Sequence, residues 1–224
     1  AVITIASGNM TIGTADTGTA TFSVSSGATL NGTAAKLTGI TVSGDGNTTV
    51  TALSDTPAAA LVGITSTGTL SVSTAADVSD FTGTLPAEDC TLSGGSFTVS
   101  GNAFTTGKTY TVNSTDSLTA PAARLNGKTI AGTGDVTVTA LNASTAADLS
   151  NITNTGTVTV NTDANVTFTG TLPPVDSTLS SSHTYTVNSN AFTTGKTYTV
   201  ASGSTLSSTA ARLNSKTVVA TGTV

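Results

Sequence analysis

Residues that could carry out chemistry are scarce in this sequence. Its 224 residues include one Cys, one His, 12 acidic and 7 basic residues, and no Trp. Acid–base, thiol and metal chemistry each need a cluster of His, Cys, Asp or Glu side chains. Seven basic residues in a chain of net charge −5 do not make the positive surface that nucleic acids bind. The composition therefore predicts a chain that is not an enzyme, carries no cofactor and has no nucleic-acid partner.

The sequence contains a tandem repeat of 88 residues, and these few residues lie within it. The segment 102–112 recurs without change at 190–200, and the motif Ala-Ala-x-Leu recurs at the same spacing. The register slips by one residue within the unit and later recovers. We interpret the chain as a diverged partial repeat, two full units and a partial third unit, at residues 1–21, 22–109, 110–197 and 198–224. Because the third unit stops inside a repeat element, we expect either a longer array or terminal strands that another chain completes.

Because the sequence repeats, each reactive residue can be compared with the residue at the equivalent position of the other unit. Cys90 aligns with Ser177, and His183 lies beside a one-residue insertion without a counterpart in the first unit. A single Cys also excludes an intrachain disulfide. We therefore expect no catalytic or metal-binding role for either residue.

The segment Gly44-Asp45-Gly46-Asn47 is weakly similar to a calcium-binding loop. Its carboxylate moves in the equivalent segment 132–135 and is absent from 220–223. A tight turn is therefore the preferred interpretation, since calcium needs several oxygen ligands in fixed positions. Calcium ions shared between chains through scattered Asp residues stay open as an alternative.

The basic residues behave differently from the acidic ones. All seven fall into three repeat classes, Lys36/Arg124/Arg212, Lys108/Lys196 and Lys128/Lys216, whereas among the acids only Asp89/Asp176 recurs. We predict a structural or assembly role for these nine residues. Their stems would cover apolar surface, and the basic heads would meet carbonyl groups or Asp89 and Asp176 across coils or chains. Recent duplication without divergence is the alternative explanation.

The elements that position these residues are predicted to be short strands. The chain has 53 Thr and 27 Ser, 37% apolar residues and a mean hydropathy of +0.19, and its β-branched residues favour strands over disorder. We predict an all-β, repetitive β-solenoid, because stacked coils need only small side chains inside. Tandem β-sandwich domains of similar size are the alternative. No run of about 18 apolar residues occurs, so no membrane span is predicted.

In the solenoid interpretation each 88-residue unit would divide into four coils. In the second unit these would be residues 122–145, 146–166, 167–190 and 191–209. The motif Ala-Ala-x-Leu, which follows Thr or Pro in every copy, would begin one helical turn. Its copies start at Ala34, Ala58, Ala122, Ala146 and Ala210.

Two segments carry a resemblance to known protein classes. Ala-Ala-Asp-Leu-Ser-Asn-Ile at 146–152 and Gly-Thr-Val-Thr-Val at 156–160 resemble Thr/Ser-rich tandem repeats of very large bacterial surface proteins. That class includes adhesin stalks, surface-layer proteins and sheath or filament subunits. The segment 125–136 is locally similar to phage tail fibres. The resemblance implies an extracellular or cell-surface protein whose partners are copies of itself, although the calcium nonapeptide of some such repeats is missing.

We therefore predict an extracellular structural protein that forms part of a filament, sheath, surface layer or stalk. The alternative is an adhesin or fibre segment that binds glycan, ice or a host receptor. Pairs such as Thr137 and Thr139 could form a hydroxyl-bearing face for ice or cell-surface polysaccharide, although any strand that alternates in this way gives the same pattern.

Overall fold

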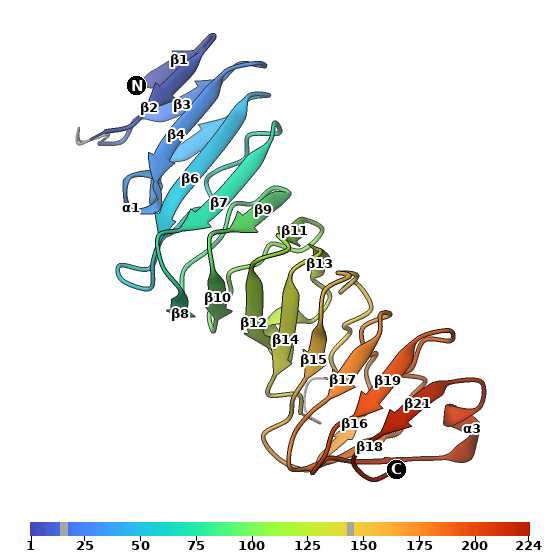
Figure 1. Cartoon of the computed structure of the whole chain (residues 1–224). Coiled ribbons are helices and arrows are strands. Elements are labelled where there is room, and N and C mark those ends of the chain that lie inside the picture. Colours follow the sequence, from blue (N-terminus) through green and yellow to red (C-terminus); the bar gives the residue numbers. More distant parts are fainter. Residues whose placement is uncertain (14–17, 143–145) are drawn as a thin grey trace. The chain divides into compact units, whose positions relative to one another are not determined.

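The computed structural model describes residues 1–13, 18–142 and 146–224. It is an all-β, parallel β-solenoid of about 11 turns with little helix (Figure 1). Neighbouring strands pair in parallel, as in the register of Val2–Ile5 with Thr21–Val24. β-Sandwiches pair their strands antiparallel. The predicted solenoid is therefore confirmed, and the alternative of tandem sandwiches is wrong.

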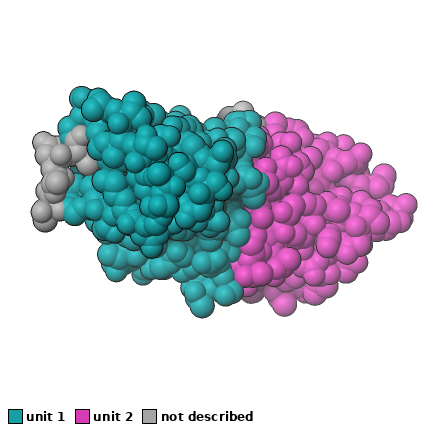
Figure 2. Space-filling view, turned by 90° about the horizontal axis from the view of Figure 1, so that it is seen from above, with its two compact units in different colours: residues 1–116 teal, residues 117–224 magenta. Residues whose placement is uncertain are grey.

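The chain divides into two compact units, Ala1–Asp116 and Ser117–Val224, which Figure 2 colours separately. In unit 1, β1, β3 and β5 form one stack, β2, β4, β6, β7, β9 and β11 form a second, and β8 pairs with β10. The elements are β1 (Val2–Ile5), β2 (Asn9–Thr11), β3 (Thr21–Val24), β4 (Thr29–Thr33), α1 (Ala34–Leu37), β5 (Thr41–Ser43), β6 (Asn47–Leu53), β7 (Leu70–Thr74), β8 (Val78–Phe81), β9 (Cys90–Ser93), β10 (Ser96–Val99) and β11 (Thr109–Val112).

In unit 2, β12, β14, β15, β17, β19 and β21 form one stack, and β16, β18 and β20 form another. Ile130 of β13 bridges to Ile152 one turn later. The elements are β12 (Ser117–Pro121), α2 (Ala122–Leu125), β13 (Thr129–Gly132), β14 (Asp135–Thr139), β15 (Val158–Val160), β16 (Val166–Phe168), β17 (Ser177–Leu179), β18 (Thr184–Val187), β19 (Thr197–Val200), β20 (Thr205–Ser208), α3 (Ala210–Leu213) and β21 (Thr217–Ala220).

The 88-residue unit is not four coils, which corrects the predicted division. Strand partners in unit 2 lie 18 residues apart for Ser117 with Asp135 and 22 apart for Val136 with Val158. When the strand registers are followed onward, four turns lead from Ser117 to Thr197. The repeat equivalent of Ser117 is Thr205, which lies eight residues beyond Thr197. A repeat unit is therefore about four and a half turns.

The half turn moves equivalent strands between stacks. β12 and β20 are repeat equivalents within unit 2, yet β12 belongs to the β14 stack and β20 to the β16–β18 stack. In unit 1, β3 and β11 are separated in the same way, with β3 in the β1 stack and β11 in the β9 stack. The same sequence thus builds alternate faces of the solenoid in successive repeats.

Alternating strand residues fill the core. Strands such as β3 and β11 bury every second side chain, as a period of two requires. All six Phe and all three Tyr are buried. The Tyr110 hydroxyl donates to the Pro86 carbonyl (2.9 Å) and accepts the Thr105 N–H (2.8 Å), while the Phe104 ring meets its ring edge to face at 5.0 Å. Tyr198 repeats this arrangement with Pro173, Thr193 and Phe192.

Three of the five predicted helical turns form. Helices α1, α2 and α3 occupy the motif copies at Ala34, Ala122 and Ala210, and Thr33 caps α1 by accepting the Lys36 N–H at 3.3 Å. The copies at Ala58 and Ala146 are not helical, so those two predictions are wrong. Their backbones form parallel bridges to the next turn, at Ala60 with Thr84 and Asp148 with Thr171, and these bridges take the groups that a helix would use.

Thr145, the residue that would cap the copy at Ala146, lies outside the described residues. In the described part of the chain, no helix has the length and apolar character needed to cross a lipid bilayer.

Candidate functional site

The four lysines of two predicted classes share one position in the fold. Each directly precedes a strand: Lys108 before β11, Lys196 before β19, Lys128 before β13 and Lys216 before β21. The three residues of the remaining class, Lys36, Arg124 and Arg212, lie in the one-turn helices. The basic residues therefore occupy the corners of the solenoid, where strands and helical turns begin or end.

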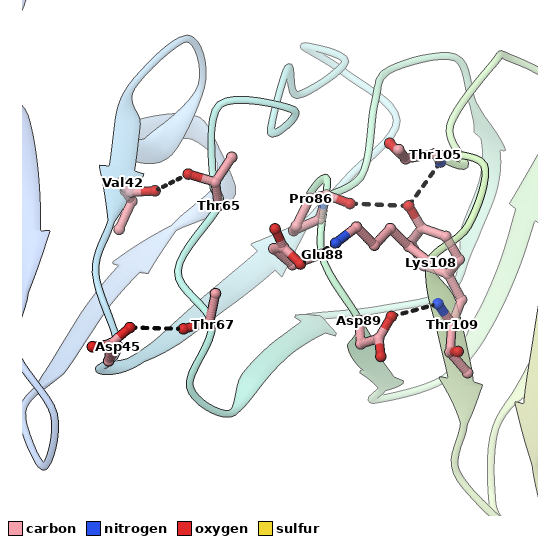
Figure 3. A network of polar contacts seen from close by, with 11 residues as sticks. Val42, Asp45, Thr65, Thr67, Pro86, Glu88, Asp89, Thr105, Lys108 and Thr109 are labelled. Atoms are coloured by element: carbon pink, nitrogen blue, oxygen red, sulfur yellow. Dashed lines mark hydrogen bonds and ion pairs between the residues drawn. The ribbon is translucent and has the colours of Figure 1, made fainter.

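Lys108 forms an ion pair across one turn with Glu88, the neighbour of the predicted partner Asp89 (Figure 3). The two side chains are 32% and 23% exposed, so water screens much of their attraction. In unit 2, Lys216 donates from Nζ to Thr194 Oγ1 (2.6 Å), also across one turn. Arg212 donates locally to Thr209 Oγ1 (3.4 Å).

Asp89 and Asp176 bind backbone groups. Asp89 Oδ1 accepts the N–H of Thr109 (2.7 Å), and Asp176 Oδ1 accepts the N–H of Thr197 (2.8 Å). In both cases the carboxylate of one turn binds the first residue of the strand in the next turn, as Figure 3 shows for Asp89. A strand-start N–H at a corner needs an acceptor, and the carboxylate provides it.

This contact between turns recurs with other oxygen-bearing side chains. The same bond joins Asn47 to Thr69 (2.8 Å), Asp77 to Ser96 (2.9 Å), Asn126 to Asp148 (2.8 Å), Asp135 to Thr157 (2.8 Å) and Asn165 to Thr184 (2.8 Å). We call these bonds, together with those of Asp89 and Asp176, the corner bonds. Each spans 19 to 22 residues, which is one turn of the solenoid.

Apart from the bond of Asn126, the corner bonds form repeat-equivalent pairs, even where the charge is not retained. Asn47 corresponds to Asp135, and Asp77 corresponds to Asn165, each 88 residues on. A variant of the bond shows the same exchange with Ser. Asp116 Oδ1 accepts the Gly94 N–H (3.1 Å), and its equivalent Ser204 accepts the Ser181 N–H (2.8 Å).

The sequence interpretation missed this class because it compared only acids with acids. The signal that would have revealed it is the exchange of Asp, Asn and Ser at equivalent positions.

Two further carboxylates have pKa values below their ordinary range. The Asp148 pKa is lowered by hydrogen bonds from Ser150 and from the Thr171 hydroxyl. The Asp55 pKa is lowered chiefly by the Ser79 hydroxyl (2.7 Å) and also by the Asp80 N–H (3.0 Å). In each case the donors favour the ionised form. Asp55 is therefore stabilised as an anion by the adjacent turn, and Asp148 by Ser150 of its own turn together with Thr171 of the next.

An open groove of about 540 Å³ lies over β15, β17 and β19 in unit 2. Its polar lining includes Asp135, Asp176, Thr178 and Thr199. The Oδ1 atoms of both Asp residues are already engaged in corner bonds. The groove therefore presents hydroxyl groups and the remaining carboxylate oxygens to solvent, which suits hydrogen bonding more than proton transfer.

Cys90 is deeply buried in β9. Burial raises the pKa of its thiol to about 12, so the sulfur is protonated near neutral pH. His183 donates its backbone N–H to Ser181 Oγ (3.2 Å). Neither position gathers partners for catalysis in the described structure.

The loop that is weakly similar to a calcium site is a tight turn against the preceding coil. Gly44 has a φ of +101°, and a Cβ there would lie 2.3 Å from the Val24 carbonyl oxygen. Asp45 Oδ1 accepts the Thr67 hydroxyl (3.0 Å), and Asn47 makes its corner bond. Among residues 1–13, 18–142 and 146–224, no three His, Cys, Asp or Glu side chains converge as a metal site would need.

Comparison of the chain with protein-family models, curated proteins and solved structures finds no match in any of the three.

Proposed function

We propose that this chain is an extracellular structural repeat protein that forms part of a filament, sheath, surface layer or stalk. The observation that carries the proposal is the set of corner bonds, most of which recur in both units even where the charge does not, as at Asn47 and Asp135. In a solenoid each turn contacts mainly its neighbours, so a contact retained between turns serves the length of the array. A site for a small ligand would instead concentrate distinctive groups at one place.

The surface chemistry also supports a structural role. All Phe and Tyr residues are buried, so no aromatic ring is available to stack against a sugar. The outward strand positions carry mainly Thr and Ser, which keep the surface hydrated with little charge. This combination suits a scaffold that meets water along its length.

Immunoelectron microscopy of the native material tests the proposal. Antibody fragments raised against residues 1–224 should label continuous fibres, a sheath or a surface layer along its whole extent. Preimmune fragments provide the control. Labelling confined to the tips of isolated stalks would favour a binding protein, and labelling inside the cell would overturn the extracellular role.

A row of outward threonine side chains in unit 2 supports a second candidate function, that of an adhesin or fibre segment that binds ice or glycan. Successive turns place outward threonines in register, at Thr119, Thr137, Thr159, Thr178 and Thr199. Parallel strands are about 4.8 Å apart, so these threonines form a regularly spaced row of hydroxyl and methyl groups. The purified chain should then inhibit ice recrystallisation or bind polysaccharide, and Thr159→Lys should reduce that activity. An inactive wild-type chain in both assays would exclude this candidate.

A further inference from the structure

Unit 1 contains a smaller groove that corresponds to the open groove of unit 2. It has a volume of about 170 Å³ and lies over β7, β9 and β11, the repeat equivalents of β15, β17 and β19. All seven residues that line it have repeat equivalents in the lining of the unit 2 groove. The groove therefore recurs with the repeat.

The outward positions of the two grooves are identical, whereas the inward positions differ. The identical positions are Gly68, Thr69, Asp89, Thr91 and Thr111 in unit 1 and Gly156, Thr157, Asp176, Thr178 and Thr199 in unit 2. The two positions that differ, Leu70 with Val158 and Cys90 with Ser177, are buried. Recent duplication alone does not explain this pattern, because the core below the groove has already diverged while its surface has not.

Packing between turns accounts for the glycine and the aspartate of each groove, but not for the threonines. A Cβ at Gly68 would lie 2.4 Å, and one at Gly156 would lie 2.1 Å, from a carbonyl oxygen of the preceding turn. Asp89 and Asp176 make corner bonds. Within the described part of the chain, the threonine hydroxyls at the identical positions make no hydrogen bond. These hydroxyls are therefore available to a ligand.

The available groups indicate the class of ligand. Each threonine hydroxyl can donate and accept a hydrogen bond, and the second oxygen of the aspartate can accept one. Thr91 pairs with Thr111 in the register, and Thr178 with Thr199, so hydroxyls follow one another at about 4.8 Å along each groove. No Lys, Arg or His lines either groove, so the carboxylate disfavours an anionic ligand. A chain of neutral sugars fits these groups, because it presents hydroxyls at regular intervals.

We propose that each groove binds a neutral polysaccharide through its hydroxyl groups, so that the chain holds two polysaccharide strands. The grooves are separate sites, since β7, β9 and β11 belong to the sheet that ends at β13, and β15, β17 and β19 belong to the sheet that ends at β21. Without an aromatic ring each contact is weak, and two sites on one chain compensate by binding together. This inference rests on the second candidate function and is independent of the structural role.

Equilibrium dialysis with labelled oligosaccharides tests the sites. The neutral probes are oligomers of glucose, mannose and N-acetylglucosamine, and an oligomer of uronic acid is the anionic probe. Thr91→Lys fills the groove of unit 1 and Thr178→Lys that of unit 2, both at half-buried outward positions. Thr49→Lys and Thr137→Lys are the matched controls, because these repeat-equivalent residues are also half-buried and line neither groove. Circular dichroism establishes that each variant is folded.

We expect the wild-type chain to bind two molecules of at least one neutral oligosaccharide. The uronic-acid oligomer should bind at least about tenfold more weakly, because its carboxylates would meet the aspartate of the groove. Thr91→Lys and Thr178→Lys should each reduce the number bound to one, and the double variant should bind none. Both control variants should still bind two.

Three outcomes would overturn the proposal. If no neutral oligosaccharide binds, the inference fails together with glycan binding as a second function, while the structural role still depends on the labelling of native material. An equal loss in Thr137→Lys and Thr178→Lys would assign binding to the whole threonine row instead of the groove, and would leave the second candidate function intact. Tighter binding of the uronic-acid oligomer would exclude a neutral polysaccharide as the ligand.

Discussion

The two units place different side chains at equivalent positions. In unit 1, the buried Thr48 and Ser66 hydroxyls bind each other at 2.7 Å. In unit 2, the equivalent residues are Val136 and Asn154, and the buried Asn154 Oδ1 has no hydrogen-bond partner. Lys108 pairs with Glu88, whereas the residue equivalent to Glu88 is Val175. Side-chain pairs thus differ between the units, but the oxygens that bind strand-start N–H groups are retained.

This difference indicates which contacts define the repeat. A backbone N–H at a corner must be satisfied in every copy, and any Asp, Asn or Ser oxygen can satisfy it. An ion pair between exposed side chains contributes little and can be lost without penalty. Selection of the backbone contact over the charge explains why Asp exchanges with Asn or Ser at equivalent corner positions.

The largest effect is expected at the buried hydroxyl pair of unit 1. Thr48→Val should lower the free energy of unfolding by about 1–3 kcal/mol, because the Ser66 hydroxyl would lose its buried partner. Thr48→Val combined with Ser66→Ala should be closer to wild type. Transplanting the pair into unit 2, with Val136→Thr and Asn154→Ser, should instead raise stability. Urea denaturation measures all three variants, and a destabilised transplant would show that the units are not interchangeable at this position.

The tyrosine hydroxyls test a feature that the units share. Tyr110→Phe and Tyr198→Phe should each lower the free energy of unfolding by about 1–2 kcal/mol, because each hydroxyl links a Pro carbonyl to a Thr N–H in the core. The two values should agree within error. A clear inequality, measured by urea denaturation, would mean that the two aromatic corners are not equivalent.

The corner bonds are tested by separating the oxygen from the charge. Asp89→Ala should lower the free energy of unfolding by about 1 kcal/mol and speed hydrogen exchange at the Thr109 amide, since that N–H loses its acceptor. Asp89→Asn should behave like wild type, because Asn makes the same bond at Asn47 and Asn165. Equal loss in both variants would indicate that the charge itself is needed.

The lysines should contribute less. Lys108→Met should change the free energy of unfolding by less than about 1 kcal/mol, because its ion pair with Glu88 is partly exposed. Lys196→Met should change the free energy of unfolding still less, because Val175 occupies the position equivalent to Glu88 in unit 2. The double variant also tests the predicted assembly role of these residues by sedimentation. Unchanged assembly would remove that role.

The smallest expected effect is a change in how stability depends on pH in the acidic range. The folded-state pKa of Asp148 is depressed, so its contribution to stability is present above the ordinary pKa of 3.8 and is lost as pH falls through the folded value. Asp148→Asn should therefore lower stability near neutral pH and flatten its dependence below about pH 4. Thermal unfolding from pH 2 to 7 measures the difference, and parallel curves for the two proteins would contradict it.

Much of the fold followed from particular residues. The unchanged return of 102–112 indicated a repeat, and the small β-branched residues favoured stacked coils over sandwiches. Helical turns at Ala34, Ala122 and Ala210 were predicted correctly. The copies at Ala58 and Ala146 were not, because their backbones bond to a neighbouring turn that lies more than 20 residues away in the sequence.

The candidate site was less accessible from the sequence. The recurrence of Lys108 and Asp89 identified corner positions, but the partners differ from those that the recurrence suggested. Glu88 binds Lys108, and Asp89 binds the backbone of Thr109. Glu88 and Asp89 are neighbours in the corner before β9, so the local path of the chain there decides which carboxylate meets the lysine and which meets the backbone.

The sequence by itself determined the β class, the 88-residue repeat and the scarcity of reactive residues, since these are properties of composition and local order. Only the tertiary structure decided that a repeat is four and a half turns long, because turn length depends on which distant strands come into register. Only the tertiary structure likewise shows that Leu125 is fully buried, where its segment bonds to the turn that contains Asp148 and Asn151. Burial is set by such neighbouring turns, which lie more than 20 residues away in the sequence and which no local pattern encodes.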